Sequence, residues 1–116
     1  MSEVTIYHNP RCSKSRQTLA LLEERGIEPA IVNYLDTPPD AATLAALLAM
    51  LGLEPRGLMR KKEAPFAELG LADPSLGDDQ LIAAMITNPI LIERPIVVSG
   101  DRAAIGRPPE DVLNIL

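Results

Sequence analysis

Cysteine, histidine and aromatic residues are scarce in this sequence. It contains one cysteine, one histidine and no tryptophan among 116 residues, and 3% of the chain is aromatic. A single cysteine cannot form an intramolecular disulfide, so the fold must rely on packing, and any disulfide chemistry must be intermolecular. We expect no bound metal and no bound cofactor.

Positive net charge and long hydrophobic runs are also absent. The formal net charge of −5 excludes a general attraction to nucleic acids or anionic membranes, so any anion site must be a local cluster of Arg or Lys. No apolar run approaches the roughly 18 to 20 residues that span a bilayer, and the N-terminus lacks a basic stretch followed by an apolar core. We therefore predict a cytoplasmic protein with no nucleic-acid and no membrane partner.

The residues that are present suffice for one compact domain, residues 1–116, because 47% of them are hydrophobic. Local signals predict a first half in the order strand, helix, strand, helix. The expected elements are strands at 4–7 and 30–35, a helix from Ser13 to Arg25 that ends at Gly26, and a helix from a cap at Asp40 to Gly52.

A helical insert and further strands are expected in the second half. Turn signals divide residues 54–88 into short helical pieces, the clearest of which begins at Asp78 and ends at Asn88. Then follow predicted strands at 90–92, 96–99 and 102–105, a hairpin at Gly100-Asp101, and a closing helix over 110–116. This order predicts a thioredoxin-like α/β fold, a mixed sheet flanked by helices, and Arg94-Pro95 fits the position of that fold's cis-proline.

The only cysteine, Cys12, lies at the predicted start of the first helix. Only the thiolate is nucleophilic, and a helix N-terminus with nearby cations lowers a cysteine pKa from about 8.5 to between roughly 3.5 and 7.5. Lys14 and Arg16 are cations in this first turn, although an ordinary exposed position suits Arg16 better. The alternative of a buried core cysteine is less favoured, because Cys12 stands between Arg11 and Ser13 in a polar turn.

Other residues of this loop add two expectations. His8 either shapes the turn or tunes the thiol, and the two alternatives are equally favoured. Ser13, Ser15 and Lys14 can bind the sulfur or the oxygens of an anion. Because Ser15 stands where a C-x-x-C motif has its second cysteine, an external thiol must resolve any oxidised or adducted Cys12, which indicates glutathione and glutaredoxin as partners.

Ordered motifs cover nearly the whole chain. They are TIYHNP at 5–10 with Cys12, Ser15 and Arg16, Tyr34-Leu35 with Pro38-Pro39, LMRK at 58–61, LGLA at 69–72, DQLI at 79–82, PILI at 89–92, RPIVV at 94–98 and Arg107-Pro108. In these residues the chain resembles the glutaredoxin-coupled arsenate reductases of the ArsC family.

The resemblance implies a nucleophile at Cys12 and an oxyanion site made by Arg60, Arg94 and Arg107. Arginine suits this role because its charge is permanent and its planar fork of N–H donors matches a tetrahedral oxyanion. The implied reaction has Cys12 attack arsenate, glutathione attack the adduct as co-substrate, and glutaredoxin reduce the mixed species with release of arsenite.

Two alternatives to arsenate reduction stay open. One is a glutathione-dependent thiol oxidoreductase without arsenate specificity. The other is a regulator like the Spx proteins, which are thioredoxin-like and bind RNA polymerase; many carry a C-x-x-C switch, which Ser15 removes here.

The chain also departs from the family pattern in one place. The better-known ArsC members have Gly and Thr after the nucleophile, where this chain has Ser13 and Lys14.

Overall fold

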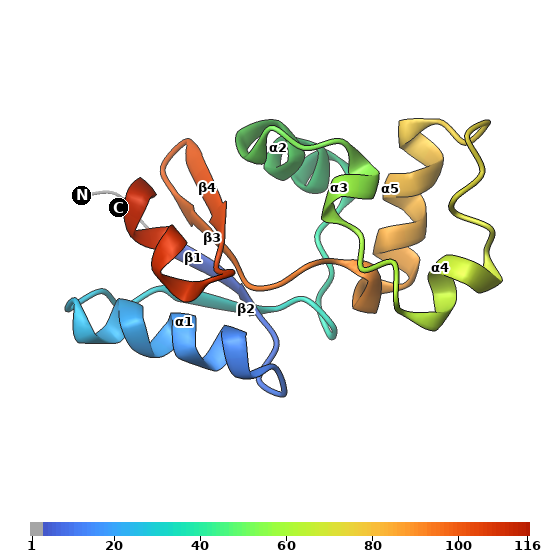
Figure 1. Ribbon diagram of the computed structural model, residues 1–116. Coiled ribbons are helices and arrows are strands. Elements are labelled where there is room, and N and C mark those ends of the chain that lie inside the picture. Colours follow the sequence, from blue (N-terminus) through green and yellow to red (C-terminus); the bar gives the residue numbers. More distant parts are fainter. Residues whose placement is uncertain (1–3) are drawn as a thin grey trace. The chain divides into compact units, whose positions relative to one another are not determined.

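The computed structural model describes residues 4–116, so the first three residues of the predicted domain 1–116 lie outside the described residues. The chain divides into two compact units (Figure 1). One unit comprises the chain up to Thr37 together with Arg94–Leu116, and the other comprises Pro38–Glu93. The expectation of a single domain stays a prediction.

A four-stranded mixed sheet forms the first unit, with the strand order β2-β1-β3-β4. Its strands are β1 (Val4–His8), β2 (Ala30–Asn33), β3 (Ile96–Ser99) and β4 (Arg102–Ile105). β1 pairs in parallel with β2 and antiparallel with β3, and β3 pairs antiparallel with β4. Parallel strands need a crossover, which α1 (Ser13–Glu24) supplies between β1 and β2. The predicted thioredoxin-like mixed α/β sheet is thus confirmed.

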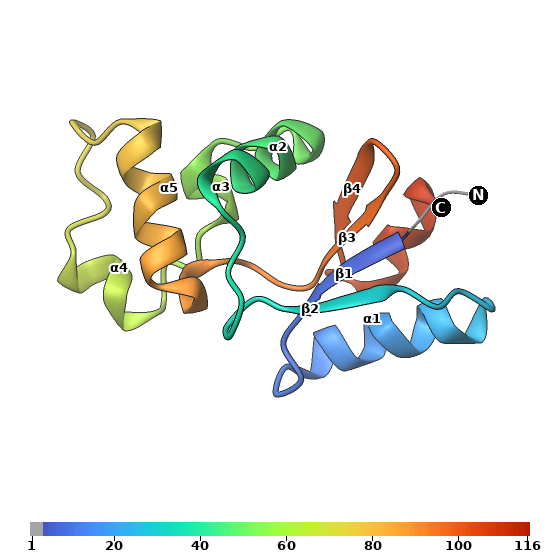
Figure 2. The same ribbon diagram turned by 180° about the vertical axis from the view of Figure 1, so that it is seen from behind.

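The core of this unit lies between the sheet and two helices. α1 packs against the 3-10 helix η2 (Pro109–Ile115), and η2 also contacts β4 (Figure 2). The buried cluster consists of Ile6 of β1, Leu22 of α1, Val97 of β3, and Val112 and Ile115 of η2. Because burial of such a side chain contributes about 1.5–3 kcal/mol, this cluster holds α1 firmly against β1 and β3, and with it the loop that carries Cys12.

The chain turns of the first unit follow local signals. α1 ends as predicted, since Gly26 has a φ of 75° and its N–H donates to the carbonyl of Glu23 at 3.0 Å. The hairpin between β3 and β4 is also confirmed, with Gly100-Asp101 as its two-residue connection. The second strand ends earlier than expected, because the carbonyl of Asn33 accepts the N–H of Asp36 at 3.1 Å and so begins a turn.

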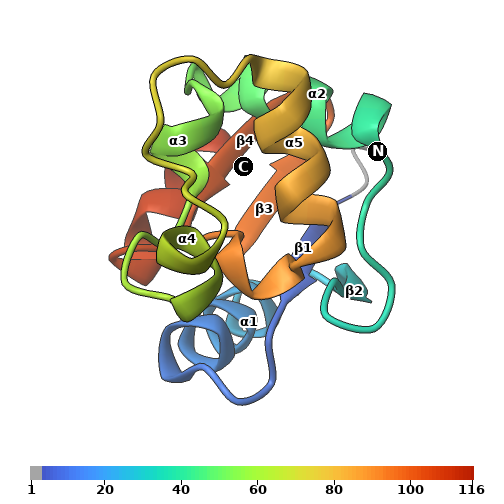
Figure 3. The same cartoon turned by 90° about the vertical axis from the view of Figure 1, so that its right-hand side faces the viewer.

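Helices and turns make up most of the second unit. It contains α2 (Ala41–Leu51), α3 (Pro55–Leu58), α4 (Ala64–Glu68), α5 (Asp78–Thr87) and the 3-10 helix η1 (Pro89–Leu91), and α5 packs against both α2 and α3 (Figure 3). The predicted cap of α2 is confirmed, since Asp40 Oδ1 accepts the N–H of Thr43 at 2.7 Å. Within residues 4–116, no helix is long and apolar enough to cross a membrane.

One predicted strand is wrong, and the predicted closing helix has 3-10 geometry. The expected strand 90–92 is largely the 3-10 helix η1, because the N–H of Ile92 donates back to the carbonyl of Pro89 at 2.9 Å; Ile92 keeps only an isolated bridge to Met59. The predicted closing helix over 110–116 is present as a 3-10 helix over Pro109–Ile115. Prolines at the start of both segments favour short turns of this kind.

Candidate active site

The loop between β1 and α1 places Cys12 at the helix start. Cys12 is the N-cap residue of α1, with the extended backbone angles φ −93° and ψ 124°. Its N–H donates to the carbonyl of Asn9 at 3.0 Å, and Arg16 Nη1 donates to the carbonyl of Pro10 at 2.9 Å. Arg16 is exposed, as expected, yet its side chain ties the loop to the first turn of α1. The sulfur therefore lies next to the N–H groups that begin the helix.

A buried polar network joins the end of β1 to the first turn of α1 and so supports this loop. Ser15 is fully buried, and its Oγ lies 2.8 Å from His8 Nδ1 and accepts the N–H of Asn9 at 3.0 Å. Burial, and next the charge of Arg16, lower the pKa of His8 below its ordinary value. A neutral His8 with an unprotonated Nδ1 can accept a hydrogen bond from the Ser15 hydroxyl. This geometry favours the turn-shaping alternative for His8.

Arginines from far along the chain reach Cys12. Arg107 Nη2 lies 3.5 Å from the Cys12 sulfur, and Arg107 Nε donates to the carbonyl of Arg94 at 2.8 Å. Arg94 shortly precedes β3 and Arg107 shortly follows β4, so the β1-β3-β4 part of the sheet brings both beside the loop after β1. The Cys12 side chain is only 9% exposed, more buried than a polar turn suggests.

The balance of these contacts activates the thiol. Burial is the largest single influence and raises the pKa of Cys12. It is outweighed by the backbone N–H of Ser15, by the hydrogen bond and charge of Arg94, and by the backbone N–H of Lys14, so the pKa lies below its ordinary value. Each of these groups presents positive charge to the sulfur and stabilises the thiolate. A lowered pKa is what the predicted nucleophile role of Cys12 requires, and that role stays a prediction.

Three other candidates are placed differently. The side chains of Ser13 and Lys14 are exposed on the first turn of α1. Arg60 belongs to the unit Pro38–Glu93, where its guanidinium pairs with Glu93 at 3.4 Å and Glu63 at 3.6 Å. Binding of an anion by these three side chains stays a prediction.

Sequence reasoning missed the connection between the two arginines beside Cys12. Nothing local predicts that Arg107 donates to the carbonyl of Arg94. The repeated Arg-Pro pair is the one visible signal, and the structure has both the Arg94-Pro95 and the Arg107-Pro108 bonds in cis.

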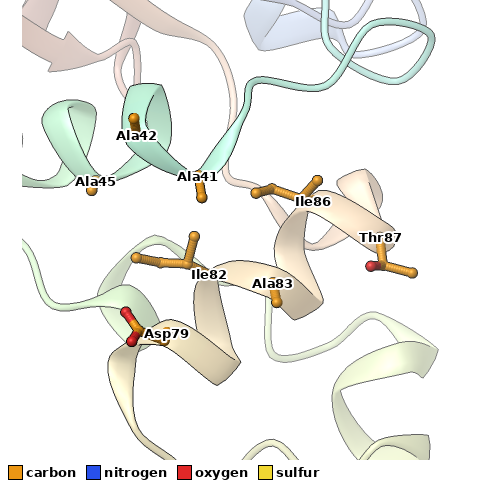
Figure 4. A pocket seen from close by; sticks show the side chains of 8 residues that line it. All are labelled: Ala41, Ala42, Ala45, Asp79, Ile82, Ala83, Ile86 and Thr87. Carbon is orange, nitrogen blue, oxygen red and sulfur yellow. The ribbon is translucent and has the colours of Figure 1, made fainter.

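The largely apolar pocket of the helical unit contains none of these candidates. Its volume is about 480 Å³, and it is lined by Ala41, Ala42, Ala45, Asp79, Ile82, Ala83, Ile86 and Thr87 (Figure 4). Asp79 and Thr87 are its polar lining residues, and no cysteine, histidine or arginine is among the residues that line it. The part of the chain that the structure describes also holds no group of three or more His, Cys, Asp or Glu side chains that could bind a metal ion.

Comparison with known proteins points to one family. The sequence profile of the ArsC family matches residues 7–115. The protein named "uncharacterized protein YfgD" of Escherichia coli K12 is 61% identical over 98% of this chain and 97% of its own length. A protein of Neisseria meningitidis named arsenate reductase is 51% identical over the full length of both chains. The structure titled arsenate reductase from Vibrio cholerae superimposes with a TM-score of 0.96 at 56% identity, covering 99% of this chain and 98% of the other.

Proposed function

Because the chain belongs to the ArsC family, we propose that it reduces arsenate to arsenite with Cys12 as the nucleophile. The observation that carries the proposal is the position of the Cys12 sulfur, at the start of α1 and 3.5 Å from Arg107 Nη2. The names of relatives such as the Neisseria meningitidis protein supply the substrate.

In the first step, the Cys12 thiolate attacks the arsenic of arsenate. A sulfur–arsenic bond forms, and one arsenate oxygen leaves as water after it is protonated. Negative charge develops on the remaining oxygens of the arsenate group. The guanidinium groups of the arginines and the N–H groups at the start of α1 stabilise this charge. Arg94 and Arg107 are the first two arginines of this site, and Arg60 is the third that we propose from the family pattern.

The electrons must come from thiols outside the chain, because it has no second cysteine. Glutathione adds to the arsenic of the adduct with loss of water. The glutaredoxin thiolate then attacks the glutathione sulfur; a mixed disulfide forms, and the electron pair of the broken sulfur–arsenic bond reduces arsenic from As(V) to As(III). Water displaces Cys12, which releases arsenite and restores the thiolate. Ser13 and Lys14 contribute exposed donors at the entrance to the anion site.

Measurement of arsenite formation by the purified chain tests the proposal. With arsenate, glutathione and glutaredoxin, the wild-type chain should form arsenite, whereas Cys12→Ser should form none above background. Arg25→Ala, at an exposed position at the far end of α1, is the matched control and should be as active as wild type.

Omission of each reductant separates the parts of the proposal. Loss of arsenite formation without glutathione, and again without glutaredoxin, supports the coupling. If the wild-type chain forms no more arsenite than Cys12→Ser with both reductants present, arsenate reduction at Cys12 is refuted. Full activity without glutaredoxin would contradict the coupling alone.

A further inference from the structure

Gly106 is the most crowded glycine of the chain. A Cβ atom added there would lie 2.5 Å from Thr18 Oγ1 and 2.8 Å from Pro95 Cγ, both closer than van der Waals contact. At the other six glycines an added Cβ meets either nothing within 4 Å or, at Gly57, ordinary contact with Leu53 from 3.4 Å. The φ of Gly106 is not in the left-handed region, so close packing, and not backbone freedom, requires glycine here.

This contact joins the segments that carry the reactive groups. Thr18 is fully buried, and its Oγ1 donates to the carbonyl of Lys14 at 2.8 Å, in the first turn of α1. Gly106 donates its N–H to the carbonyl of Pro95 at 2.9 Å. Pro95 directly follows Arg94, and Arg107 directly follows Gly106. The helix that follows Cys12 and the segments of both arginines therefore contact one another at Gly106.

We propose that Thr18 and Gly106 are positioning residues that set the distance between the start of α1 and the segments of Arg94 and Arg107. The proposal rests on the proposed function for its effect on arsenate, but not for its effect on the thiol. Neither residue touches the reacting atoms; both act through Cys12 and the arginines.

The interactions of the Cys12 sulfur with Arg94 and Arg107 depend on short distances. Arg107 Nη2 donates a hydrogen bond to the Cys12 sulfur at 3.5 Å, and the interactions of Arg107 and Arg94 with the thiolate weaken with distance. A methyl group at Gly106 requires that Thr18, Pro95 or the Gly106–Arg107 segment shifts. Each of these lies on a segment that carries Cys12, Arg94 or Arg107, so we expect the shift to change the distances between the sulfur and the arginines.

Three variants and a control test this inference. Gly106→Ala introduces the clash, Thr18→Ala removes the contacts with Thr18 and leaves the one with Pro95 Cγ at 2.8 Å, and the double variant combines both. Gly77→Ala is the matched control, because a Cβ there meets nothing within 4 Å and φ is −83°. For each, we would measure the thermal unfolding temperature, the pH dependence of Cys12 alkylation by iodoacetate, and kcat and KM for arsenate.

Gly106→Ala should shift the alkylation profile to higher pH and lower kcat/KM for arsenate roughly tenfold or more, the effect of a small misplacement at a reacting centre. The double variant should return both quantities toward the wild-type values, and Gly77→Ala should leave both unchanged. A rescue of this kind is not expected from a loss of stability alone.

Other results would overturn the inference. It fails if folded Gly106→Ala keeps the wild-type alkylation profile, or if the double variant is no better than Gly106→Ala. If Gly106→Ala does not fold, the double variant decides. Recovery of the fold supports the contact with Thr18, because the clash with Pro95 Cγ at 2.8 Å remains and only part of the effect on the profile can be relieved. A double variant that also stays unfolded contradicts the contact. If even the wild-type chain forms no arsenite, the proposed function fails, while the alkylation profiles still test the positioning.

Discussion

Replacement of Arg107 by alanine removes two contacts. Arg107 Nη2 lies 3.5 Å from the Cys12 sulfur, and Nε donates to the Arg94 carbonyl at 2.8 Å. A hydrogen bond from a charged donor contributes about 1.5–3 kcal/mol. Because Arg107 is exposed, we take the lower figure for each contact.

The loss of one contact in the transition state then lowers kcat/KM for arsenate about tenfold, and the loss of both lowers it roughly 100-fold. Arg107→Lys keeps the charge but loses the planar fork, so its kcat/KM should lie between those of wild type and Arg107→Ala. The thermal unfolding temperature should also fall, because the bond to the Arg94 carbonyl is lost from the folded chain, so kcat/KM is compared at a temperature where every variant is folded.

The assay is the steady-state rate of arsenite formation at varied arsenate concentration, with glutathione and glutaredoxin in excess. Arg25→Ala serves as the control for the loss of one exposed positive charge. If folded Arg107→Ala retains the kcat/KM of Arg25→Ala, Arg107 has no part in the chemistry and the reasoning from its two contacts is refuted.

Four further changes have defined outcomes. Arg94→Ala should move the alkylation profile of Cys12 to higher pH, because the hydrogen bond and charge of Arg94 help to lower that pKa; an unmoved profile would contradict this. Ser15→Ala removes the buried hydroxyl that His8 contacts, and in urea denaturation it should lose about 1–3 kcal/mol of unfolding free energy; an unchanged midpoint would show that the network adds nothing. Because folding lowers the pKa of Cys12, the stabilisation by its thiolate is complete above the unfolded value of about 8.5 and is lost as pH falls through the folded value. Cys12→Ser should therefore gain less unfolding free energy than wild type as pH rises through this range, and equal gains would count against a lowered pKa. Asp40→Ala should lower the unfolding temperature while Asp40→Asn preserves it, since both Asp and Asn can cap α2; equal melting of the two variants would argue against the cap.

The parts of the fold that sequence predicts well are those with local signals. A glycine at 26 with a positive φ, an N-cap aspartate at 40 and the glycine of the hairpin at 100 each act within a few residues of their own position. The prediction of a strand at 90–92 failed because it also used a local signal, the strand propensity of Ile-Leu-Ile. The hydrogen bond from the N–H of Ile92 to the carbonyl of Pro89 depends on the chain around it.

The candidate site divides in the same way. The nucleophile loop is contiguous, so the position of Cys12 at the start of a helix could be predicted from its neighbours. Its contact with Arg107 joins residues 95 positions apart, and only the order of strands in the sheet creates it. Family resemblance supplied those arginines, whereas the crowding at Gly106 arises from packing between segments that no local pattern relates.

Titration of the Cys12 thiol in the wild-type chain is the most direct test of an activated nucleophile in this site. The rate of iodoacetate alkylation, followed across pH without ligand, reports the fraction of thiolate. The N–H groups at the start of α1 and the charge of Arg94 predict a pKa below that of an ordinary cysteine, about 8.5. A pKa at or above that value would contradict an activated thiolate at Cys12, and with it the proposed chemistry.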